Sequence, residues 1–275
     1  MPAGMRPCVL YLTQENTVEE TIERIWSHCF GNNSKIQDFD PQEAADMLKS
    51  VGLSEQDDPT KAEIIIKYRS TKTISVNDIR GMISELEKDG KKTVMIVQDY
   101  IKRLRPSQNI KDNTRLEYSV ISDDLAALAK ELNIPILTAM QFNRDGVREV
   151  ESATTLMDQI ASIERVGSSN ISESIDIFQN ADYCFSLGRA TDMAINEAGS
   201  PEVKGKYLVV KLLAGRGKEP KVKSFKHRFI DGNDMRLDED VDCPYSKSTF
   251  TKENMVNQSQ ASSEARTKGP RRILN

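Results

Sequence analysis

Residues 92–100 read Lys-Thr-Val-Met-Ile-Val-Gln-Asp-Tyr, an apolar run that ends in a single acidic side chain. Val94–Val97 is unbroken and flanked by polar residues, the pattern of a strand that is covered on both faces in a parallel sheet. The carboxyl ends of such strands border the ligand crevice of an open α/β sheet. Asp99 therefore lies either at a ligand site or in a turn that its carboxylate stabilises, and turn-forming Asp is common at such positions.

Composition limits the classes of protein to which the chain can belong. The 275 residues are 38% hydrophobic and 29% charged, which suits one large α/β domain or two small ones. The net charge is −4 and the pI is near 5.5, so any nucleic-acid contact must be local or assembled from several subunits. The four cysteines and two histidines are scattered, which disfavours a zinc site or a disulfide framework. No apolar run approaches the roughly 20 residues of a membrane span, so we expect a cytoplasmic protein without membrane contact.

Strand-like and helical segments alternate along the first 140 residues. Thr17, followed three residues later by Glu20, has the pattern of a capping box at the start of the first helix. The alternation favours a mostly parallel sheet with right-handed crossovers. The expected strands lie at 8–12, 63–69, 94–97 and 133–140, and the expected helices at 17–30, 41–51, 75–89 and 117–132.

Three of these strands end in polar or acidic side chains. Glu15 follows the first strand, Asp99 ends the third, and Gln141 begins a polar cluster after the fourth. Because the carboxyl ends of parallel strands meet at one edge, we expect these side chains to face one crevice. A glutamate at a strand end is more often a solvated turn residue than a base, unless it faces another carboxylate there.

The rest of the chain combines long connections with further β structure. Residues 102–115 form a basic loop without apolar periodicity, and 145–167 is a charged excursion with a helix near 155–163. The final segment, 243–275, is rich in polar residues, and we expect it to be disordered. Between these segments we expect a helix at 172–179, a strand at 181–187, a loop at 188–205, and a β-hairpin formed by 206–213 and 222–229.

Several short segments, in this order, carry a family resemblance: 74–79, Val97-Gln98-Asp99-Tyr100, 125–135, Gln141-Phe142-Asn143-Arg144 and 174–187. Together they resemble the motor domain of DnaB-type hexameric replicative helicases, over roughly residues 8–230. The resemblance implies an α/β, RecA-like fold: a mostly parallel sheet flanked by helices, with a C-terminal β-hairpin and a disordered tail. Residues 1–242 would form the motor domain and 243–275 the tail.

The resemblance also implies roles for the strand-end residues. Asp99 is similar to the Walker B carboxylate, which holds Mg²⁺ mainly through water. Glu15 is similar to the catalytic glutamate that orients or deprotonates the attacking water. Gln141 resembles the polar sensor that contacts the γ-phosphate. ATP and Mg²⁺ are therefore the implied cofactors, with Asp99 and Gln141 at the cofactor and Asp99 at the metal.

Two further catalytic groups are implied from a neighbouring subunit. Lys211 aligns with the family's lysine that reaches the adjacent ATP site and stabilises transition-state charge. Leu213 stands where the family has the matching arginine, so Arg216 is the candidate if the turn has shifted. Head-to-tail interfaces of this kind close into rings, and a homohexamer is implied.

Loops 102–115 and 145–167 occupy the positions of the family's two central-channel loops, which grip single-stranded DNA. Primase and the helicase loader are further partners that the resemblance implies. Basic side chains suit phosphate contacts, and the implied DNA-binding residues are Lys102, Arg103, Arg105, Lys111, Arg115, Arg144 and Arg148.

The 275 residues contain no GxxxxGK[ST] motif, the loop whose backbone N–H groups cradle nucleotide phosphates. Gly90-Lys91-Lys92-Thr93 lacks the upstream glycine and precedes a strand instead of a helix. In the family this loop comes just before the strand at 8–12. We therefore expect either an N-terminally incomplete motor or a natural chain without autonomous ATPase activity, and favour the first; alone, the chain should hydrolyse ATP poorly or not at all.

Three functions are compatible with these features. The first is ATP-dependent unwinding of duplex DNA at a phage or bacterial replication fork, by a ring helicase that translocates on single-stranded DNA. The second is a RecA/RadA-type recombinase ATPase, which the Gln-Phe-Asn-Arg strand end and the 125–135 helix disfavour. The third, which the missing phosphate loop supports, is a non-catalytic RecA-like DNA-binding or assembly subunit.

Overall fold

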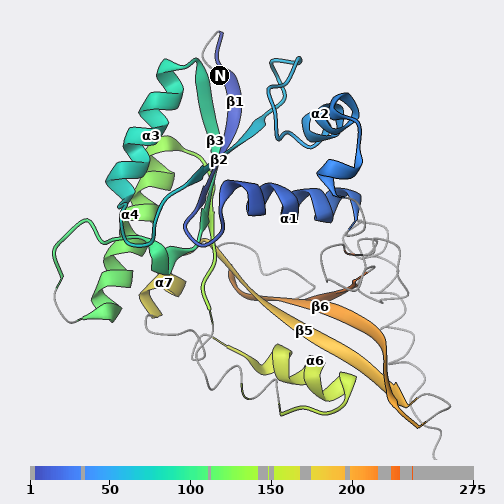
Figure 1. Cartoon of the computed structure of the whole chain (residues 1–275). Coiled ribbons are helices and arrows are strands. Elements are labelled where there is room, and N and C mark those ends of the chain that lie inside the picture. Colours follow the sequence, from blue (N-terminus) through green and yellow to red (C-terminus); the bar gives the residue numbers. More distant parts are fainter. Residues whose placement is uncertain are drawn as a thin grey trace, which may run out of the picture.

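The strands predicted in the first 140 residues form one parallel sheet, shown in Figure 1 in a computed structural model of the chain. The strands are β1 (Arg6–Thr13), β2 (Glu63–Tyr68), β3 (Lys91–Asp99) and β4 (Ile136–Thr138), in the order β2-β1-β3-β4. This arrangement confirms the predicted α/β, RecA-like class. The structure describes residues 4–31, 35–110, 113–141, 148, 152–167, 175–195, 199–215, 224–229 and 237.

The register brings three strand ends to neighbouring positions. Thr13 of β1 pairs with Asp99 of β3, and Gln98 of β3 pairs with Thr138 of β4. The residues that directly follow β1 and β4 therefore leave the sheet at the same edge as Asp99. This edge is the one at which open α/β sheets place their ligands.

Helices cover the sheet on both sides. Figure 1 shows α3 and α4 on one side and α1 and α2 on the other. The predicted capping box of α1 is confirmed, because Glu20 N donates to Thr17 Oγ1 at 3.2 Å and Thr17 N donates to Glu20 Oε2 at 2.8 Å. The elements are α1 (Val18–Phe30), α2 (Pro41–Ser50), α3 (Val76–Lys88) and α4 (Thr114–Leu132), with short 3-10 helices η1 (Ile36–Asp38) and η2 (Ile101–Arg103).

The main core lies between the sheet and the α3–α4 pair. Leu10 and Ile96 are fully buried there and pack with Ile121 of α4. Burying one such side chain contributes about 1.5–3 kcal/mol. On the opposite face, Tyr11 and Val97 are only partly buried. The strand that contains the apolar run 94–97 is thus buried on one face and only partly buried on the other.

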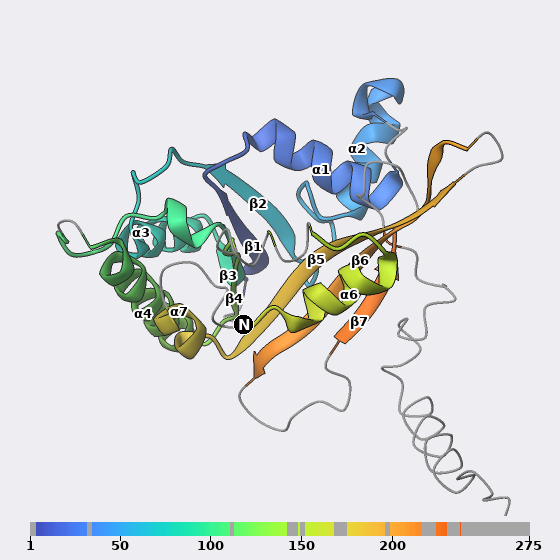
Figure 2. The same ribbon diagram turned by 90° about the horizontal axis from the view of Figure 1, so that it is seen from below.

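A second, antiparallel sheet follows the parallel one, and Figure 2 shows α6 lying across it. Ile163 of α6 packs so closely on Gly188 that an added Cβ there would lie 2.6 Å from it, which only glycine avoids. The elements are α6 (Leu156–Arg165), α7 (Ile175–Asn180), β5 (Tyr183–Ile195), β6 (Pro201–Gly215) and β7 (Ser224–Arg228), in the sheet order β5-β6-β7.

Two predicted loops differ from the structure. Most of 188–205 is strand, because β5 and β6 pair along their length from Tyr183–Gly215 to Ile195–Pro201. This stretch lacks apolar alternation, so its strand character comes from cross-strand pairing. The loop predicted at 102–115 is also shorter at both ends: η2 begins at Ile101, and α4 begins at Thr114.

The earlier start of α4 has a local cause. The Asn113 side chain accepts a hydrogen bond from Leu116 N at 3.0 Å and caps the helix. Arg115 is therefore a first-turn helix residue and not a loop residue. The β6–β7 connection at 216–223 and the tail at 243–275 lie outside the described residues.

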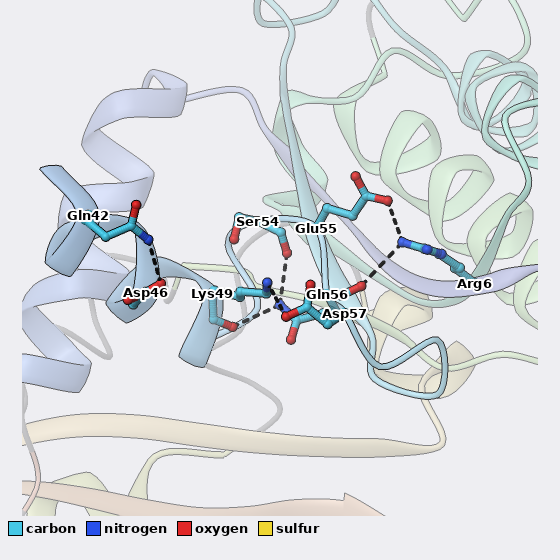
Figure 3. Close-up of polar contacts among 8 residues, drawn as sticks. All are labelled: Arg6, Gln42, Asp46, Lys49, Ser54, Glu55, Gln56 and Asp57. Carbon is cyan, nitrogen blue, oxygen red and sulfur yellow. Dashed lines mark hydrogen bonds and ion pairs between the residues drawn. The ribbon is translucent and has the colours of Figure 1, made fainter.

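At the opposite end of the sheet, exposed polar groups connect β1 to the segment after α2 (Figure 3). Arg6 forms an ion pair with Glu55, and its Nη1 also donates to the Gln56 carbonyl oxygen at 3.3 Å. Gln56 Nε2 donates to the Lys49 carbonyl oxygen at 2.9 Å, and Lys49 pairs with Asp57 at 2.5 Å.

None of the described helices combines the length and apolarity that crossing a membrane requires.

Candidate functional site

The structure brings Glu15 and Asp99 together at the carboxyl edge of the sheet. Gln14 N donates to the Asp99 carbonyl oxygen at 3.1 Å, so the pairing of β1 with β3 continues one residue beyond β1. Thr13 Oγ1 then donates to the Asn16 carbonyl oxygen at 2.7 Å and accepts from Asn16 N at 3.1 Å, which closes a tight turn. Glu15 is held inside that turn.

Burial and like charge act together on Asp99. Burial raises the pKa of its carboxyl group, and the neighbouring charge of Glu15 raises that pKa further. Arg24 of α1 and Arg103 of η2 lower it in part. Burial, and then the charge of Asp99, likewise raise the pKa of Tyr11. Two carboxylates therefore share a site whose negative charge a cation would neutralise.

The fit of this site to Mg²⁺ follows from the number of protein ligands. Among the described residues, no three His, Cys, Asp or Glu side chains cluster as a metal cage would require. Mg²⁺ dehydrates reluctantly and is usually held by one or two carboxylates, with water and substrate phosphates completing the octahedron. Asp99, with Glu15 beside it, suits such a phosphate-dependent ion.

A buried glutamine pair lies directly behind the carboxylates, and the sequence prediction missed it. Gln98 Nε2 donates to Gln14 Oε1 at 2.9 Å, and the two residues are 1% and 3% exposed. Gln14 Nε2 donates to the Ser70 carbonyl oxygen at 3.0 Å, and Thr138 Oγ1 donates to the Gln98 carbonyl oxygen at 3.0 Å. These bonds join the ends of all four parallel strands. The sequence did contain a clue to this pair, because a glutamine directly precedes each predicted site carboxylate: Gln14 before Glu15 and Gln98 before Asp99.

The turn between β2 and α3 joins the same network. Thr71 Oγ1 donates to the Gln14 carbonyl oxygen at 3.2 Å, and Lys72 N donates to the Arg103 carbonyl oxygen at 2.7 Å. Lys72 Nζ lies 5.3 Å from the centre of the Tyr118 ring and 3.1 Å from Glu117 Oε2. Lys72, which the sequence prediction did not include, thus lies close to the start of the predicted DNA loop.

Arg103 points toward the carboxylates and not simply into solvent. Its Nη2 lies 3.6 Å from Glu15 Oε1, and its guanidinium carbon lies 5.2 Å from the centre of the Tyr100 ring. Leu104, the next residue, is fully buried and anchors this part of the chain. The assigned DNA contact of Arg103 stays a prediction, and the structure adds a second partner.

The other predicted DNA-binding residues are dispersed. Lys102 Nζ lies 5.8 Å from the Tyr118 ring centre, and Arg105 pairs loosely with Asp78 at 3.6 Å. Arg115 lies in α4, and the Arg148 carbonyl oxygen accepts from Ser152 N at 3.0 Å. Lys111 and Arg144 lie outside the described residues, as does Arg216 from the predicted catalytic set.

Gln141 and Lys211 occupy different surroundings. Gln141 is exposed and lies three residues beyond the end of β4, at the carboxyl edge of the sheet. Lys211 is on β6, where its Nζ donates to the Val166 carbonyl oxygen at 3.0 Å and to that of Glu164. The lysine thus satisfies carbonyl groups at the C-terminus of α6, where a positive charge is favourable. Its action on a neighbouring subunit stays a prediction.

Curated relatives of the chain are replicative helicases. It is 34% identical over 112 residues to the replicative DNA helicase DnaB of Geobacillus stearothermophilus, covering 41% of this chain and 22% of that protein. It is 32% identical over 112 residues to the replicative DNA helicase DnaC of Bacillus subtilis, with the same coverage of 41% and 22%. The match to the Mycoplasma pneumoniae DnaB helicase is 29% over 131 residues, or 47% and 25%. The chain thus spans a quarter or less of these relatives.

Solved structures and a family model give the broader match. A solved ATPase domain shares the fold with a TM-score of 0.57 at 20% identity, covering 84% of this chain and 74% of that one. A DnaB-like replicative helicase, described with its interactions with primase, gives a TM-score of 0.56 at 20% identity, covering 84% and 50%. The model of the DnaB-like helicase C terminal domain matches residues 5–230. The chain therefore belongs to the family of DnaB-like helicase C-terminal domains.

Proposed function

We propose that the chain is the motor part of a ring helicase that uses ATP to unwind duplex DNA at a replication fork. The observation that carries the proposal is the placement of Glu15 beside Asp99, at the ends of two neighbouring parallel strands. Family membership makes this edge the expected nucleotide site. We extend the proposal to a homohexamer on single-stranded DNA, with primase and a helicase loader as partners.

The two carboxylates would have different roles in ATP hydrolysis. Asp99 would hold Mg²⁺ through its carboxylate, and the bound ion would neutralise charge on the ATP phosphates. Glu15 stands beside Asp99 in a tight turn, where it can orient a water molecule and accept its proton. The buried Gln14–Gln98 pair holds the two strand ends in register, so the carboxylates keep their relative position.

Exposed cations support the proposed DNA contact. The side chain of Arg105 is 56% exposed and that of Lys72 is 39% exposed. Arg105 belongs to the segment 102–115 that the family resemblance places in the central channel, and Lys72 lies beside the start of that segment, where its N donates to the Arg103 carbonyl oxygen. Because the whole chain is acidic, with a net charge of −4, a ring that gathers these local cations around one channel would strengthen binding beyond that of a single chain.

The first test uses the 275-residue chain and a fluorescently labelled oligothymidylate. We expect saturable binding that weakens steeply as salt increases, because phosphate contacts release counterions. Fluorescence anisotropy at salt concentrations from about 50 to 200 mM measures the affinity. It also gives the slope of the logarithm of the affinity against the logarithm of the salt concentration. Absence of binding at the lowest salt would contradict the proposed DNA contact.

The second test concerns hydrolysis in an extended version that carries a phosphate loop and its strand ahead of β1. Glu15→Gln should retain nucleotide binding and lose about 10²–10⁴-fold in turnover, whereas Asp99→Asn should weaken Mg²⁺-dependent steps. Glu131→Gln, at a surface pair with Arg80, is the matched control. Unchanged turnover in both site variants would remove the carboxylates from the mechanism. DNA binding by an extended version that hydrolyses no ATP would favour the non-catalytic DNA-binding subunit.

A further inference from the structure

We propose that Arg103 is a positioning residue shared by two sites. Without DNA its guanidinium holds the Glu15 carboxylate, and a phosphate of single-stranded DNA at the following loop competes with Glu15 for that guanidinium. The inference rests on the proposed function, because it takes single-stranded DNA as the ligand of the loop. It assigns Arg103 a place between the nucleotide edge and the DNA contact.

Arg103 lies close enough to attract the Glu15 carboxylate, but the contact is weak enough for the guanidinium to leave it for another anion. The Nη2–Oε1 distance is 3.6 Å, and the two side chains are 32% and 46% exposed. A partly exposed pair at this separation is weak. A phosphate, in contrast, can accept two parallel N–H bonds from one guanidinium. Competition between the two anions is therefore balanced closely enough for DNA to displace the carboxylate.

Arg103 also keeps unused hydrogen-bonding capacity. A guanidinium carries several N–H donors in a fixed planar fork. Within the described part of the chain, the Nε of Arg103 is buried and has no hydrogen-bond partner. The contact with the Tyr100 ring, 5.2 Å from the guanidinium carbon to the ring centre, uses none of these donors. Turning the guanidinium toward a phosphate therefore exchanges the 3.6 Å contact with Glu15 for a new one and breaks no hydrogen bond at Nε among the described residues.

The backbone of Arg103 is fixed, so exchange needs only side-chain rotation. Arg103 N donates to the Tyr100 carbonyl oxygen at 2.9 Å, and the Arg103 carbonyl oxygen accepts from Lys72 N at 2.7 Å. Leu104 is fully buried in the main core. The side chain therefore pivots from a stationary point shortly after Asp99, at the start of the basic segment 102–115, and its Nη2 lies 3.6 Å from Glu15 Oε1.

The surrounding charges favour a phosphate on the loop side. Lys72 Nζ and Lys102 Nζ lie 5.3 and 5.8 Å from the centre of the Tyr118 ring, and Lys72 N donates to the Arg103 carbonyl oxygen. Glu117 pairs with Lys72 at 3.1 Å, and Glu15 contacts the Arg103 side chain. A DNA phosphate near these lysines would attract the guanidinium and leave Glu15 free to turn toward water. By thermodynamic linkage, any change that frees Arg103 from Glu15 must also strengthen DNA binding.

A double-mutant cycle on DNA affinity tests this linkage without ATP. The 275-residue chain, Glu15→Gln, Arg103→Leu and the double variant are titrated with labelled oligothymidylate. Glu15→Gln should tighten binding about fivefold, within the usual range of coupling between sites, and Arg103→Leu should weaken it. In the Arg103→Leu background, Glu15→Gln should have no effect. Glu131→Gln, whose partner Arg80 lies 2.8 Å away on α3, should leave the affinity unchanged.

The contrary outcomes separate this inference from the proposed function. If Glu15→Gln tightens binding equally in both backgrounds, Glu15 acts only by repelling DNA and the inference is wrong. It is also wrong if Glu15→Gln alone changes nothing. If the unmodified chain binds no DNA, both proposals fail together. Arg103→Gln is run in parallel because it keeps a polar side chain without the charge. Circular dichroism establishes that each variant is folded.

Discussion

Polar side chains are tied together at both ends of β1, but the two ends differ in burial. At the amino end, Arg6 pairs with Glu55, and these side chains are 43% and 75% exposed. At the carboxyl end, Gln14 bonds to Gln98, and both are almost completely buried. An exposed ion pair is screened by water and adds little stability. A buried amide pair adds a modest amount when complete and costs much more when one partner is lost.

The difference shows where the chain requires accurate placement. The amino end joins β1 to a surface segment, and alternative partners in water can replace each contact. The carboxyl end joins four strands directly behind Glu15 and Asp99, where water cannot replace a missing partner. Accurate geometry is thus concentrated at the edge that carries the candidate site.

The largest expected effect comes from Gln98→Leu. This change leaves Gln14 Oε1 buried without a donor, but it also removes Gln98 Oε1, which is buried without a hydrogen-bond partner among the described residues. We therefore expect a loss in the lower part of the range of about 1–3 kcal/mol in the free energy of unfolding. Gln14→Leu combined with Gln98→Leu should cost less than Gln98→Leu alone, because both buried polar groups are then removed. Urea unfolding of the wild type, the two single variants and the double variant measures this. A double variant that loses the sum of the single effects would show that the pair is not a unit.

Asp99→Asn should have a smaller, stabilising effect that depends on pH. The pKa of Asp99 in the folded chain is raised above its ordinary value of 3.8, so the folded state binds the proton more tightly than the unfolded state. Wild-type stability therefore rises as pH falls through the raised pKa toward 3.8. Asn carries no charge, so the variant should be more stable than wild type at neutral pH and lose that advantage near pH 3.8.

Thermal unfolding at a series of pH values measures this difference between the two proteins. A constant difference across the acid range would show that Asp99 titrates normally. Asp89→Asn, at an exposed position that ends α3, is the control for a general change of net charge.

The smallest effect is expected at the amino end. Glu55→Gln removes the ion pair with Arg6 but leaves both side chains hydrated, so the free energy of unfolding should change by less than about 0.5 kcal/mol. Added salt should reduce even this difference, because exposed charges are screened. A loss as large as that of Gln98→Leu would remove the contrast between the two ends.

Local patterns predicted local structure well. The capping box at Thr17 depends on residues three positions apart, and it forms as expected. The alternation of elements predicted the parallel sheet, and the strand ends at Asp99 and Glu15 follow from where the apolar runs stop. Interactions of this kind depend on neighbours in the chain, which is why sequence alone could identify them.

Pairings between distant residues were not accessible in the same way. The strand character of 188–195 depends on β6, since its own residues lack an apolar alternation. The Gln14–Gln98 bond joins residues 84 positions apart, and the Arg103–Glu15 contact depends on where η2 turns. Each requires the register between strands, which is set by packing of the whole sheet.

Short-range patterns were enough to establish the class of the sheet, the order of its elements and the acidic residues at its carboxyl edge, because apolar periodicity and capping act over a few residues. Which polar groups meet at that edge became known only from the folded chain. Folding buried the two glutamines behind the carboxylates, raised the pKa of Asp99 through burial and the charge of Glu15, and turned Arg103 toward Glu15. These effects depend on distance and on exclusion of water, which arise only when separate strands pack side by side.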